Sequence, residues 1–559
     1  MLAPAALLAD EPASADAFVL TPASGDAVGG LGAPSAATPR LPHGVHFRDG
    51  RYFQDLCGHG WLQCMGRRVL PESYVPYSPP PPPRTKAEAP QGMGPSDVLT
   101  AYNVPSSSAA NGRIVAIIDS PDSQAYTDLS TYRSAYGLPA LPRCTGNPTG
   151  ALPACFAQVA EDGGPSTGAN TCSSEQSCDD GETSLDTQMI SAVCPDCSIL
   201  LVETNLDSGT GADLVAAVAT AARLGASAIN ISFGGVEATD PSSQCATVSG
   251  ANPVGFTTPG HLVVAASGDY GYEDENCGGT APAYPASAPD VLAVGGTTLK
   301  AGSPYTEIAW NDGTGGQDAT VSGCSTEFAQ PSWQVPLLSS SGCGKRALVD
   351  VSAVAAFSDS TGTSIYIASY TGGNGGDWAG TEGTSAAAPL VAALLTRVGL
   401  TTTISNDLGW PYANASAFND VTTGDDDSNG ACNNLLCKSQ VGWDGPTGVG
   451  TPNATALLAL VGSSSGNVSS GSGSGSGSEG DSGSSDDFGS SSAESSGDDH
   501  ASVTTTTSCT AAGPASAPID GLAVLAFAGA AAALARRRRA TSARLVIAGR
   551  PPQVITARE

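Results

Sequence analysis

Residues 380–389 read GTEGTSAAAP, and the run continues as the apolar stretch SAAAPLVAALLTRVG over residues 385–399. The length and apolar character of this stretch predict a long buried helix. Ser385 follows Gly-Thr and precedes three alanines and a proline, which suggests a serine nucleophile at the start of that helix. A serine nucleophile needs a base, so another part of the chain must supply a proton acceptor.

Before this helix, apolar runs of strand length alternate with helical stretches. The alternation predicts an α/β domain whose mostly parallel sheet is covered by helices on both faces. In such sheets the functional loops follow the carboxyl ends of the strands. The predicted strands are RIVAIID (113–119), SILLVET (198–204), SAINISFG (227–234), HLVVAASG (261–268) and VLAVGG (291–296), and the predicted helices are GETSLDTQMISAVC (181–194) and ADLVAAVATAARLG (212–225).

The composition changes several times along the 559 residues. The start is apolar but lacks the basic region of a complete signal peptide, and Ser/Gly/Asp repeats cannot bury a core. Near the end, a cysteine, an apolar run and an arginine cluster resemble the sorting tails of bacterial surface proteins. We therefore expect a truncated signal segment (1–22), a proline-rich pro-region (23–93), the α/β domain (94–462), a disordered stalk (463–508), an apolar sorting tail (509–539) and a tail of unknown role (540–559).

The charge and the cysteines indicate where the protein works. A formal net charge of −30 argues against nucleic acid as a partner. Fifteen cysteines predict seven disulfides and export, so we expect an extracellular or cell-surface bacterial protein, attached to a membrane or surface through its tail. Sequence order does not determine the connectivity. The close pairs are Cys57/Cys64, Cys144/Cys155, Cys172/Cys178, Cys194/Cys197, Cys245/Cys277, Cys324/Cys343 and Cys432/Cys437, with Cys509 left over.

The five histidines offer Ser385 no convincing base. Only His261 lies within the α/β domain, and it opens a predicted strand with no helix to direct it toward Ser385. A Ser-His-Asp arrangement can use any chain order, but the fold must deliver the histidine. A carboxylate is therefore the better candidate. The histidines outside the domain are His43, His46, His59 and His500.

Three carboxylates are candidates for the missing base and its partners. Glu182 and Asp186 lie four residues apart on a predicted helix and share one face. Two carboxyls in an apolar site share a proton, which raises one apparent pKa and suits a general base in acidic water. Asp269 directly follows the strand HLVVAASG, at the active edge of a parallel sheet. Taken singly, each residue also fits a solvated helix face or an ordinary turn.

Three motifs, GETSLD, SGDYG and EGTSAAAP, stand in order along the chain. With PSDVLTAYNVP, IVAIIDSPD, YPASAPDVLAVGGTTL and VDVSAV, they resemble the sedolisin family of serine-carboxyl peptidases (peptidase family S53) from about Gly94 to Val461. The resemblance implies a subtilisin-like three-layer fold and a serine endopeptidase that is active in acid. Tripeptidyl exopeptidase action stays open. Proteins or peptides would be the substrates, and we expect a monomer.

The resemblance also implies a role for each matching residue. Ser385 would be the nucleophile, Glu182 the base that takes its proton, and Asp186 a hydrogen-bond partner that holds Glu182 in place. Asp269 would line the oxyanion hole with main-chain N–H groups, and it must be protonated to donate a hydrogen bond there. Glu382 stands where the family often has Gly or Ser, and we expect it to face solvent.

One structural calcium ion is implied at the end of the domain. Calcium takes roughly six to eight oxygen ligands from carboxylates and carbonyls. An acidic loop cluster without a metal is the alternative interpretation. The positions that match the family are the carboxylates of Asp420 and Asp444 and the carbonyl oxygens of Val421 and Gly442, within FNDVTTGDDD (418–427) and SQVGWDGPTGVGTP (439–452).

Two other functions compete with an active peptidase of this family. A histidine-dependent subtilisin-like protease would use the same sheet, but the chain lacks an HGT-type histidine motif. A catalytically inactive cell-surface binding module would have no need to keep the serine and the three acids. The region before Gly94 is shorter than the large prodomain that the family resemblance implies. We expect maturation between the proline run and Gly94.

Overall fold

The computed structural model describes residues 45–48, 51–56, 63–70, 76, 90, 92–166, 180–204, 212–237, 256, 258–277, 281–312, 318–357, 362–367, 376–430 and 432–465. The signal segment predicted at 1–22, the sorting tail and the final tail lie outside these residues, as does nearly all of the predicted stalk. Within the described ranges, no helix is long and apolar enough to cross a membrane.

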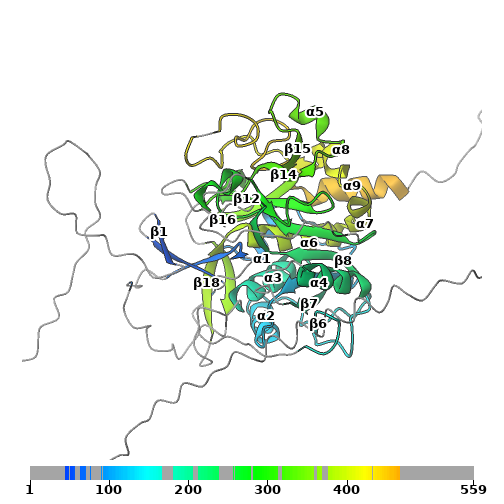
Figure 1. Ribbon diagram of the computed structural model, residues 1–559. Helices are drawn as coiled ribbons and strands as arrows, with labels where there is room; N and C mark the ends of the chain where they lie inside the picture. Colours follow the sequence, from blue (N-terminus) through cyan, green and yellow to red (C-terminus); the bar gives the residue numbers. More distant parts are fainter. Residues whose placement is uncertain are drawn as a thin grey trace, which may run out of the picture. The chain divides into compact units, whose positions relative to one another are not determined.

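An eight-stranded sheet is the centre of the described structure (Figure 1). Its neighbouring strands pair in parallel except at the antiparallel pair of β12 with β13. The predicted mostly parallel sheet is therefore confirmed. In spatial order the strands are β13 (Thr306–Ala309), β12 (Leu292–Lys300), β10 (Leu262–Ala266), β8 (Ala226–Ile231), β5 (Ile114–Asp119), β7 (Ser198–Glu203) and β6 (Phe156–Ala160), and β16 (Val351–Phe357) also pairs with β12.

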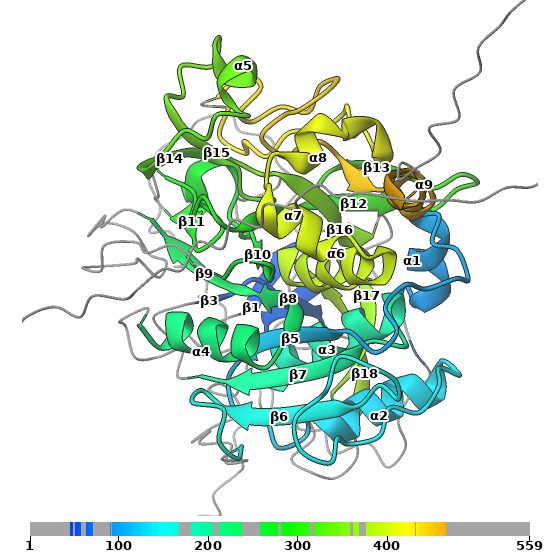
Figure 2. The ribbon, with the colours of Figure 1, turned by 90° about the vertical axis from the view of Figure 1, so that its right-hand side faces the viewer.

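Helices cover the sheet on both faces, as the continuous apolar strands predict. Ile117 of β5 belongs to the same buried cluster as Leu394 of α6 (Thr384–Val398). Its neighbour Ile118 points to the other face and belongs to the cluster that contains α4 (Ala212–Arg223). Figure 2 shows α6 lying across the strands on one face. The three-layer arrangement is thus confirmed.

The helix α3 (Asp180–Val193) packs directly against α6. Ile190 and Val193 of α3 are buried in the cluster that also holds the apolar side chains of α6. The two helices predicted to carry Glu182 and Ser385 are therefore neighbours. The remaining helices are α1 (Pro95–Ala101), α2 (Ala125–Ala135), α5 (Val335–Leu338), α7 (Thr401–Asn406), α8 (Trp410–Ala413) and α9 (Ala454–Ser465), with the short helices η1 (Tyr272–Cys277) and η3 (Ala415–Ala417).

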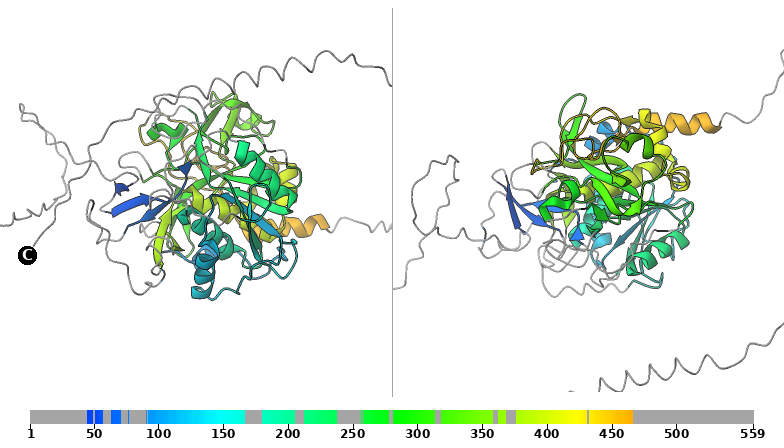
Figure 3. Two further views of the ribbon diagram at one scale, coloured as in Figure 1. Left: turned by 60° about the horizontal axis from the view of Figure 1, so that its bottom comes forward. Right: turned by 45° about the horizontal axis from the view of Figure 1, so that its top comes forward.

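Part of the proline-rich region 23–93 packs onto the α/β domain. β1 (Val45–Arg48), β2 (Arg51–Asp55) and β4 (Arg67–Val69) share a five-stranded sheet with β18 (Asp377–Glu382) and β17 (Thr363–Ile367). Figure 3 shows the N-terminal strands, in dark blue, beside the domain. The smaller sheets join β3 (Gln63–Cys64) to β9 (Phe233–Val236) and β11 (Ala283–Tyr284), β14 (Gly323–Ala329) to β15 (Lys345–Leu348), and β19 (Phe418–Asn419) to β20 (Thr451–Pro452).

Four of the predicted disulfides are confirmed. Cys64 is also disulfide-bonded, while the other predicted pairs involve residues outside the described ranges. The bonds join Cys144 to Cys155, Cys194 to Cys197, Cys324 to Cys343 and Cys432 to Cys437.

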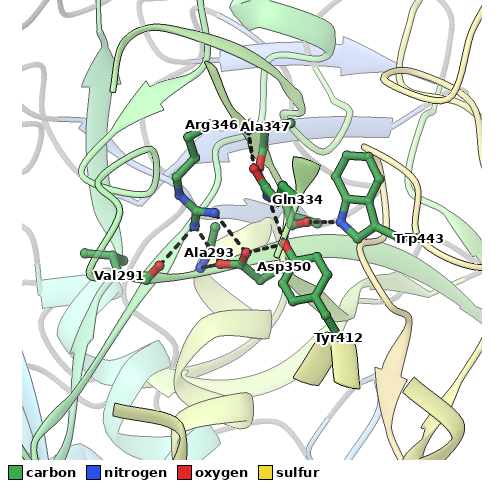
Figure 4. A network of polar contacts seen from close by, with 9 residues as sticks. Val291, Ala293, Gln334, Arg346, Ala347, Asp350, Tyr412 and Trp443 are labelled. Carbon is green, nitrogen blue, oxygen red and sulfur yellow. Dashed lines mark hydrogen bonds and ion pairs between the residues drawn. The ribbon is translucent and has the colours of Figure 1, made fainter. Parts of the chain in front are cut away.

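A buried ion pair connects β15 to the central sheet (Figure 4). Arg346 donates hydrogen bonds to both carboxyl oxygens of Asp350, at 3.0 and 2.7 Å, and to the main-chain oxygen of Val291 at 3.0 Å. Asp350 also accepts from the main-chain N–H of Ala293 at 2.7 Å and from the hydroxyl of Tyr412 at 2.6 Å. Since both carboxyl oxygens of Asp350 are partnered, this network holds the motif VDVSAV against the sheet.

The Arg346→Ala variant leaves the Asp350 carboxylate buried without its cation. We expect the free energy of unfolding to fall by about 3–5 kcal/mol, the usual cost of breaking a buried pair from one side. Urea denaturation measures this free energy of unfolding. The exposed neighbour Lys345 provides the control, since Lys345→Ala should stay within about 0.5 kcal/mol of wild type. Equal stability of the two variants would contradict the assignment.

Candidate active site

Three elements bring the predicted catalytic residues into one buried cluster. Glu182 and Asp186 lie on α3, Ser385 lies in the first turn of α6, and Asp269 lies in the loop after β10. All four side chains are buried. The packing of α3 against α6 gathers the first three, and the parallel strand β10 delivers the fourth from the carboxyl edge of the sheet.

Asp269 is anchored to the residue before Ser385. Its Oδ1 atom accepts hydrogen bonds from the main-chain N–H and the hydroxyl of Thr384, both at 2.9 Å. Burial raises the pKa of Asp269 to about 7, while the charge of Arg67 and the two Thr384 bonds oppose the rise and Asp318 adds to it. The Asp269 carboxyl therefore holds a proton in acidic solution.

Gly383 makes room for an oxygen atom between Asp269 and Ser385. Its φ of +127° lies where side chains are strained, and a Cβ atom there would meet Asp269 Oδ2 at 2.7 Å and the main-chain oxygen of Met65 at 2.2 Å. Asp269 Oδ2 has no hydrogen-bond partner among the described residues. A protonated Oδ2 can therefore donate to an oxygen that lies beside Gly383.

Asp186 is held by two polar side chains, one in β8 and one directly after it. Asn230 donates to its Oδ2 atom and Ser232 to its Oδ1 atom, both at 2.8 Å, and Asn230 also donates to the Ser232 hydroxyl at 2.9 Å. Burial raises the pKa of Asp186 to about 8, and the two hydrogen bonds oppose this rise. We did not predict Asn230 and Ser232 as site residues. Their spacing of two in the apolar run SAINIS was the available signal.

Glu182 is buried close to other acids. Burial raises its pKa well above the ordinary value, Asp186, Asp119 and Asp269 raise it further, and the nearby Ser385 hydroxyl lowers it. Neither oxygen of Glu182 has a partner within hydrogen-bond geometry in the described part of the chain. The expected hydrogen bond from Asp186 is not formed, since the Asp186 oxygens are taken by β8 and Ser232. The charge of Asp186 couples the titration of the two carboxyls instead.

Ser385 presents both its hydroxyl and its main-chain N–H to the cluster. The hydroxyl donates to the main-chain oxygen of Ser232 at 3.3 Å, and the N–H donates to the main-chain oxygen of Met65 at 2.8 Å. The main-chain oxygen of Met65 thus lies between the Ser385 N–H and the Asp269 carboxyl. Nothing in the sequence pattern singled out Met65, because the contact joins segments that are hundreds of residues apart.

His261 was the one histidine within the domain that could have been the base. His261 lies at the opposite end of β10 from Asp269, and its Nδ1 atom lies 2.6 Å from the main-chain oxygen of Ala226. It is therefore not positioned to act as the base for Ser385.

The expectation that Glu382 faces solvent is wrong. Glu382 is 2% exposed, because β18 continues into the site and pairs there with Arg67 of β4.

The four residues predicted to bind calcium lie together at the end of the domain. Asp420 Oδ2 accepts from the main-chain N–H of Gly442 at 3.0 Å. Asp444 Oδ1 accepts from the N–H of Thr447 at 3.0 Å and from its hydroxyl at 2.8 Å, and that hydroxyl lies 3.3 Å from the Val421 carbonyl oxygen. Burial, with a contribution from Asp420, raises the pKa of Asp444 to about 7.

These oxygen atoms fit a hard divalent cation. Asp420 and Asp444 form no ion pair with any cation in the described part of the chain. No cluster of three or more His, Cys, Asp or Glu side chains suited to a metal occurs in the same ranges. An ion here would therefore depend on main-chain carbonyls as well as on the two carboxylates, which is common for calcium.

Comparisons with known proteins point to one group of enzymes. A sequence model of the Subtilase family matches residues 168–402. Kumamolisin from Bacillus sp. (strain MN-32) is 32% identical over 408 residues, covering 68% of this chain and 66% of kumamolisin. Sedolisin from Pseudomonas sp. (strain 101) is 30% identical over 398 residues, covering 66% of this chain and 61% of sedolisin. The chain thus spans just under two thirds of the length of these curated relatives.

A solved structure gives the same result for the fold. The structure of Pseudomonas sedolisin, described as a serine-carboxyl proteinase complexed with pseudo-iodotyrostatin, matches with a TM-score of 0.51 at 26% identity. The match covers 67% of this chain and 99% of that structure. Sequence and fold agree over the region that contains the buried serine and its three acids. The chain therefore belongs to the sedolisin family.

Proposed function

We propose that the protein is a secreted or surface-attached serine-carboxyl endopeptidase that hydrolyses peptide bonds in acid. One observation carries the proposal. The Ser385 N–H and the Asp269 carboxyl both border the small space beside Gly383, where a substrate carbonyl oxygen can lie. Such fixed donors stabilise the oxyanion that forms when a serine attacks a carbonyl carbon. The relatives named above support the same reaction class.

Glu182 is the residue that we assign as general base. It lies near the Ser385 hydroxyl, and its oxygens have no other hydrogen-bond partner among the described residues. Its raised pKa makes it a stronger base than an ordinary carboxylate. Asp186 is held in place by Asn230 and Ser232, and its charge opposes simultaneous ionisation of Glu182 and Asp186. The Ser385 proton passes to Glu182 during attack and returns to the leaving nitrogen.

Asp269 sets the upper pH limit of the proposed reaction. Only its protonated form donates to the oxyanion. Since its pKa is raised to about 7, the donor is present below that pH and is lost as the pH rises through it. Acidic solution therefore favours the form of Asp269 that donates to the oxyanion.

We also propose that one calcium ion stabilises the end of the domain. The Asp420 and Asp444 carboxylates and the Val421 and Gly442 carbonyl oxygens would hold it. The ion would offset the repulsion between two nearby carboxylates that have no cationic partner in the described ranges. Its role would be structural, because the Asp420 loop supplies none of the catalytic residues.

The proposed location and partners follow from the same features. Four formed disulfides fit an oxidising compartment, such as the outside of a cell. Proteins or peptides would be the substrates of a monomeric enzyme. A catalytically inactive binding module remains the competing function, and the variants below separate the two.

Ser385→Ala and Glu182→Gln should both abolish most peptide cleavage in acid. We expect kcat to fall roughly a million-fold without the nucleophile, and by about a hundred- to ten-thousand-fold without the base. Hydrolysis of a fluorogenic peptide library measures both. The exposed Glu327 serves as the matched control, and Glu327→Gln should keep wild-type activity. Wild-type activity in Glu182→Gln would reject the assigned base, and an inactive wild type would favour the binding module.

Asp269→Asn should change the pH profile rather than remove activity. The asparagine keeps an oxygen that accepts from Thr384 and has an NH₂ donor at every pH. Wild-type kcat/KM should fall at or above about pH 7, whereas this alkaline limb should move upward or disappear in Asp269→Asn. Asp269→Ala, which lacks any donor, should lose about a hundred- to a thousand-fold at all pH values. An unchanged alkaline limb in Asp269→Asn would contradict the assignment.

Removal of calcium should destabilise the domain. At a free concentration about 100 times Kd, a bound ion stabilises the fold by about 2.7 kcal/mol, so excess EDTA should lower Tm and added calcium should restore it. Asp420→Asn should have a lower Tm in calcium and a smaller response to EDTA. Magnesium replaces calcium as the control. A Tm that EDTA leaves unchanged would overturn the calcium site.

A further inference from the structure

The segment 63–69 crosses the candidate active site in an extended conformation. Before the site, β3 pairs antiparallel with β9, with Gln63 opposite Gly234 and Cys64 opposite Phe233. After the site, β4 pairs antiparallel with β18, with Arg67 opposite Glu382. The main chain is thus fixed by sheet hydrogen bonds on both sides of Ser385. Peptides that add a strand to an enzyme are held in the same way.

Between these strands, Met65 is placed as the residue under attack. Its N–H donates to the main-chain oxygen of Ser232 at 3.1 Å, and its carbonyl oxygen accepts from the Ser385 N–H at 2.8 Å. The same oxygen lies beside Gly383, next to Asp269 Oδ2. The Met65 carbonyl therefore occupies the position in which the two proposed donors would stabilise an oxyanion.

The next residue, Gly66, lies against the proposed base. A Cβ atom on Gly66 would lie 2.7 Å from Glu182 Oε2 and 3.0 Å from Leu56 Cδ1. Only a residue without a side chain passes here unless the base moves. The Met65–Gly66 bond thus has the nucleophile on its carbonyl side and the carboxyl of Glu182 on its nitrogen side.

Arg67 anchors the chain beyond this bond. Its guanidinium forms an ion pair with Asp318, contacts Asp55 at 3.1 Å and lies over the Tyr270 ring, 5.2 Å from the centroid. Arg67 is 3% exposed, so its charge depends on these partners. Asp318 and Tyr270 belong to the α/β domain, which therefore recognises a basic side chain two residues after the Met65 carbonyl.

We propose that the Met65–Gly66 peptide bond is the site at which the chain cuts itself. This proposal rests on the proposed peptidase function. The segment 63–67 is the first substrate of the enzyme, and until it is cut it blocks the entry of other peptides. The bond lies before the proline run, in contrast to the region between that run and Gly94 that the sequence suggested for maturation.

The reaction balances with groups that the site contains and one water molecule. The Ser385 oxygen bonds to the Met65 carbonyl carbon as its proton passes to Glu182. The C–N bond then breaks, and Glu182 returns the proton to the Gly66 nitrogen, which becomes a new amino terminus. Water, deprotonated by Glu182, hydrolyses the Met65–Ser385 ester. Met65 ends as a carboxylic acid, and Ser385 regains its proton.

Intact-mass measurement and N-terminal sequencing of the full chain test the proposal. The protein is purified near pH 8 and shifted to about pH 4, and a fluorogenic peptide is assayed in parallel. We expect wild type to develop a new amino terminus that begins GRRVL, at a rate that dilution does not change. Ser385→Ala should keep the bond intact. Cleavage of the added peptide while the Met65–Gly66 bond stays whole would overturn the proposal and leave the peptidase function standing. No cleavage of either would overturn both.

Two variants test the geometry itself. Gly66→Ala places a methyl group against Glu182, so appearance of the new terminus should slow by about a hundredfold. Gly344→Ala is the matched control, because no atom lies within 4 Å of its added Cβ, and its rate should equal wild type. Arg67→Glu, which faces Asp318, should slow the cut as well, even if Gly66→Ala fails to fold. Wild-type rates in a folded Gly66→Ala or Arg67→Glu protein would contradict the placement of the segment.

Discussion

Three acidic side chains are buried together where α3, α6 and the end of β10 meet, and the rest of the site depends on this burial. Charge is costly in such a place, so burial raises the pKa of each of the three carboxyls. Asp269 and Asp186 have raised pKa values for this reason. Since the folded state binds these protons more tightly than the unfolded chain does, the groups stabilise the fold in acid. That contribution is lost as the pH rises through about 7 to 8.

Asp350 is also a buried acid, but its surroundings stabilise the charged form. Asp350 meets a fully buried arginine, a hydroxyl and a main-chain N–H, so its charge is balanced and the ion pair has a structural role. Asp269 and Glu182 each keep an oxygen without a hydrogen-bond partner among the described residues. The difference separates acids that hold the sheet together from acids that remain able to exchange a proton.

The N-terminal strands show how the same site receives a peptide. Both edges beside Ser385, β9 and β18, offer main-chain groups that an extended segment can pair with, and residues 63–69 use both. Both glycines leave room for a carboxyl group: a Cβ at position 66 would meet Glu182 and the side chain of Leu56, and one at position 383 would meet Asp269 and the main-chain oxygen of Met65. Substrate binding, oxyanion stabilisation and the blocked state of the uncut chain thus depend on a few main-chain contacts.

Local pattern was sufficient to predict the layers of the fold, whereas the roles of Glu182, Asp186, Asp269 and Ser385 were predicted from the resemblance of three motifs to the sedolisin family. Apolar runs and helical periodicity depend on neighbouring residues, so the sequence by itself determined the α/β class, the buried helix at 384–398 and the short-range disulfides. Only the tertiary structure decided that Asn230 and Ser232 hold Asp186, that Glu382 is buried, and that Met65 lies between Ser385 and Asp269. These contacts join segments far apart in the chain, and the packing of helices and strands, which local periodicity does not encode, brings them together.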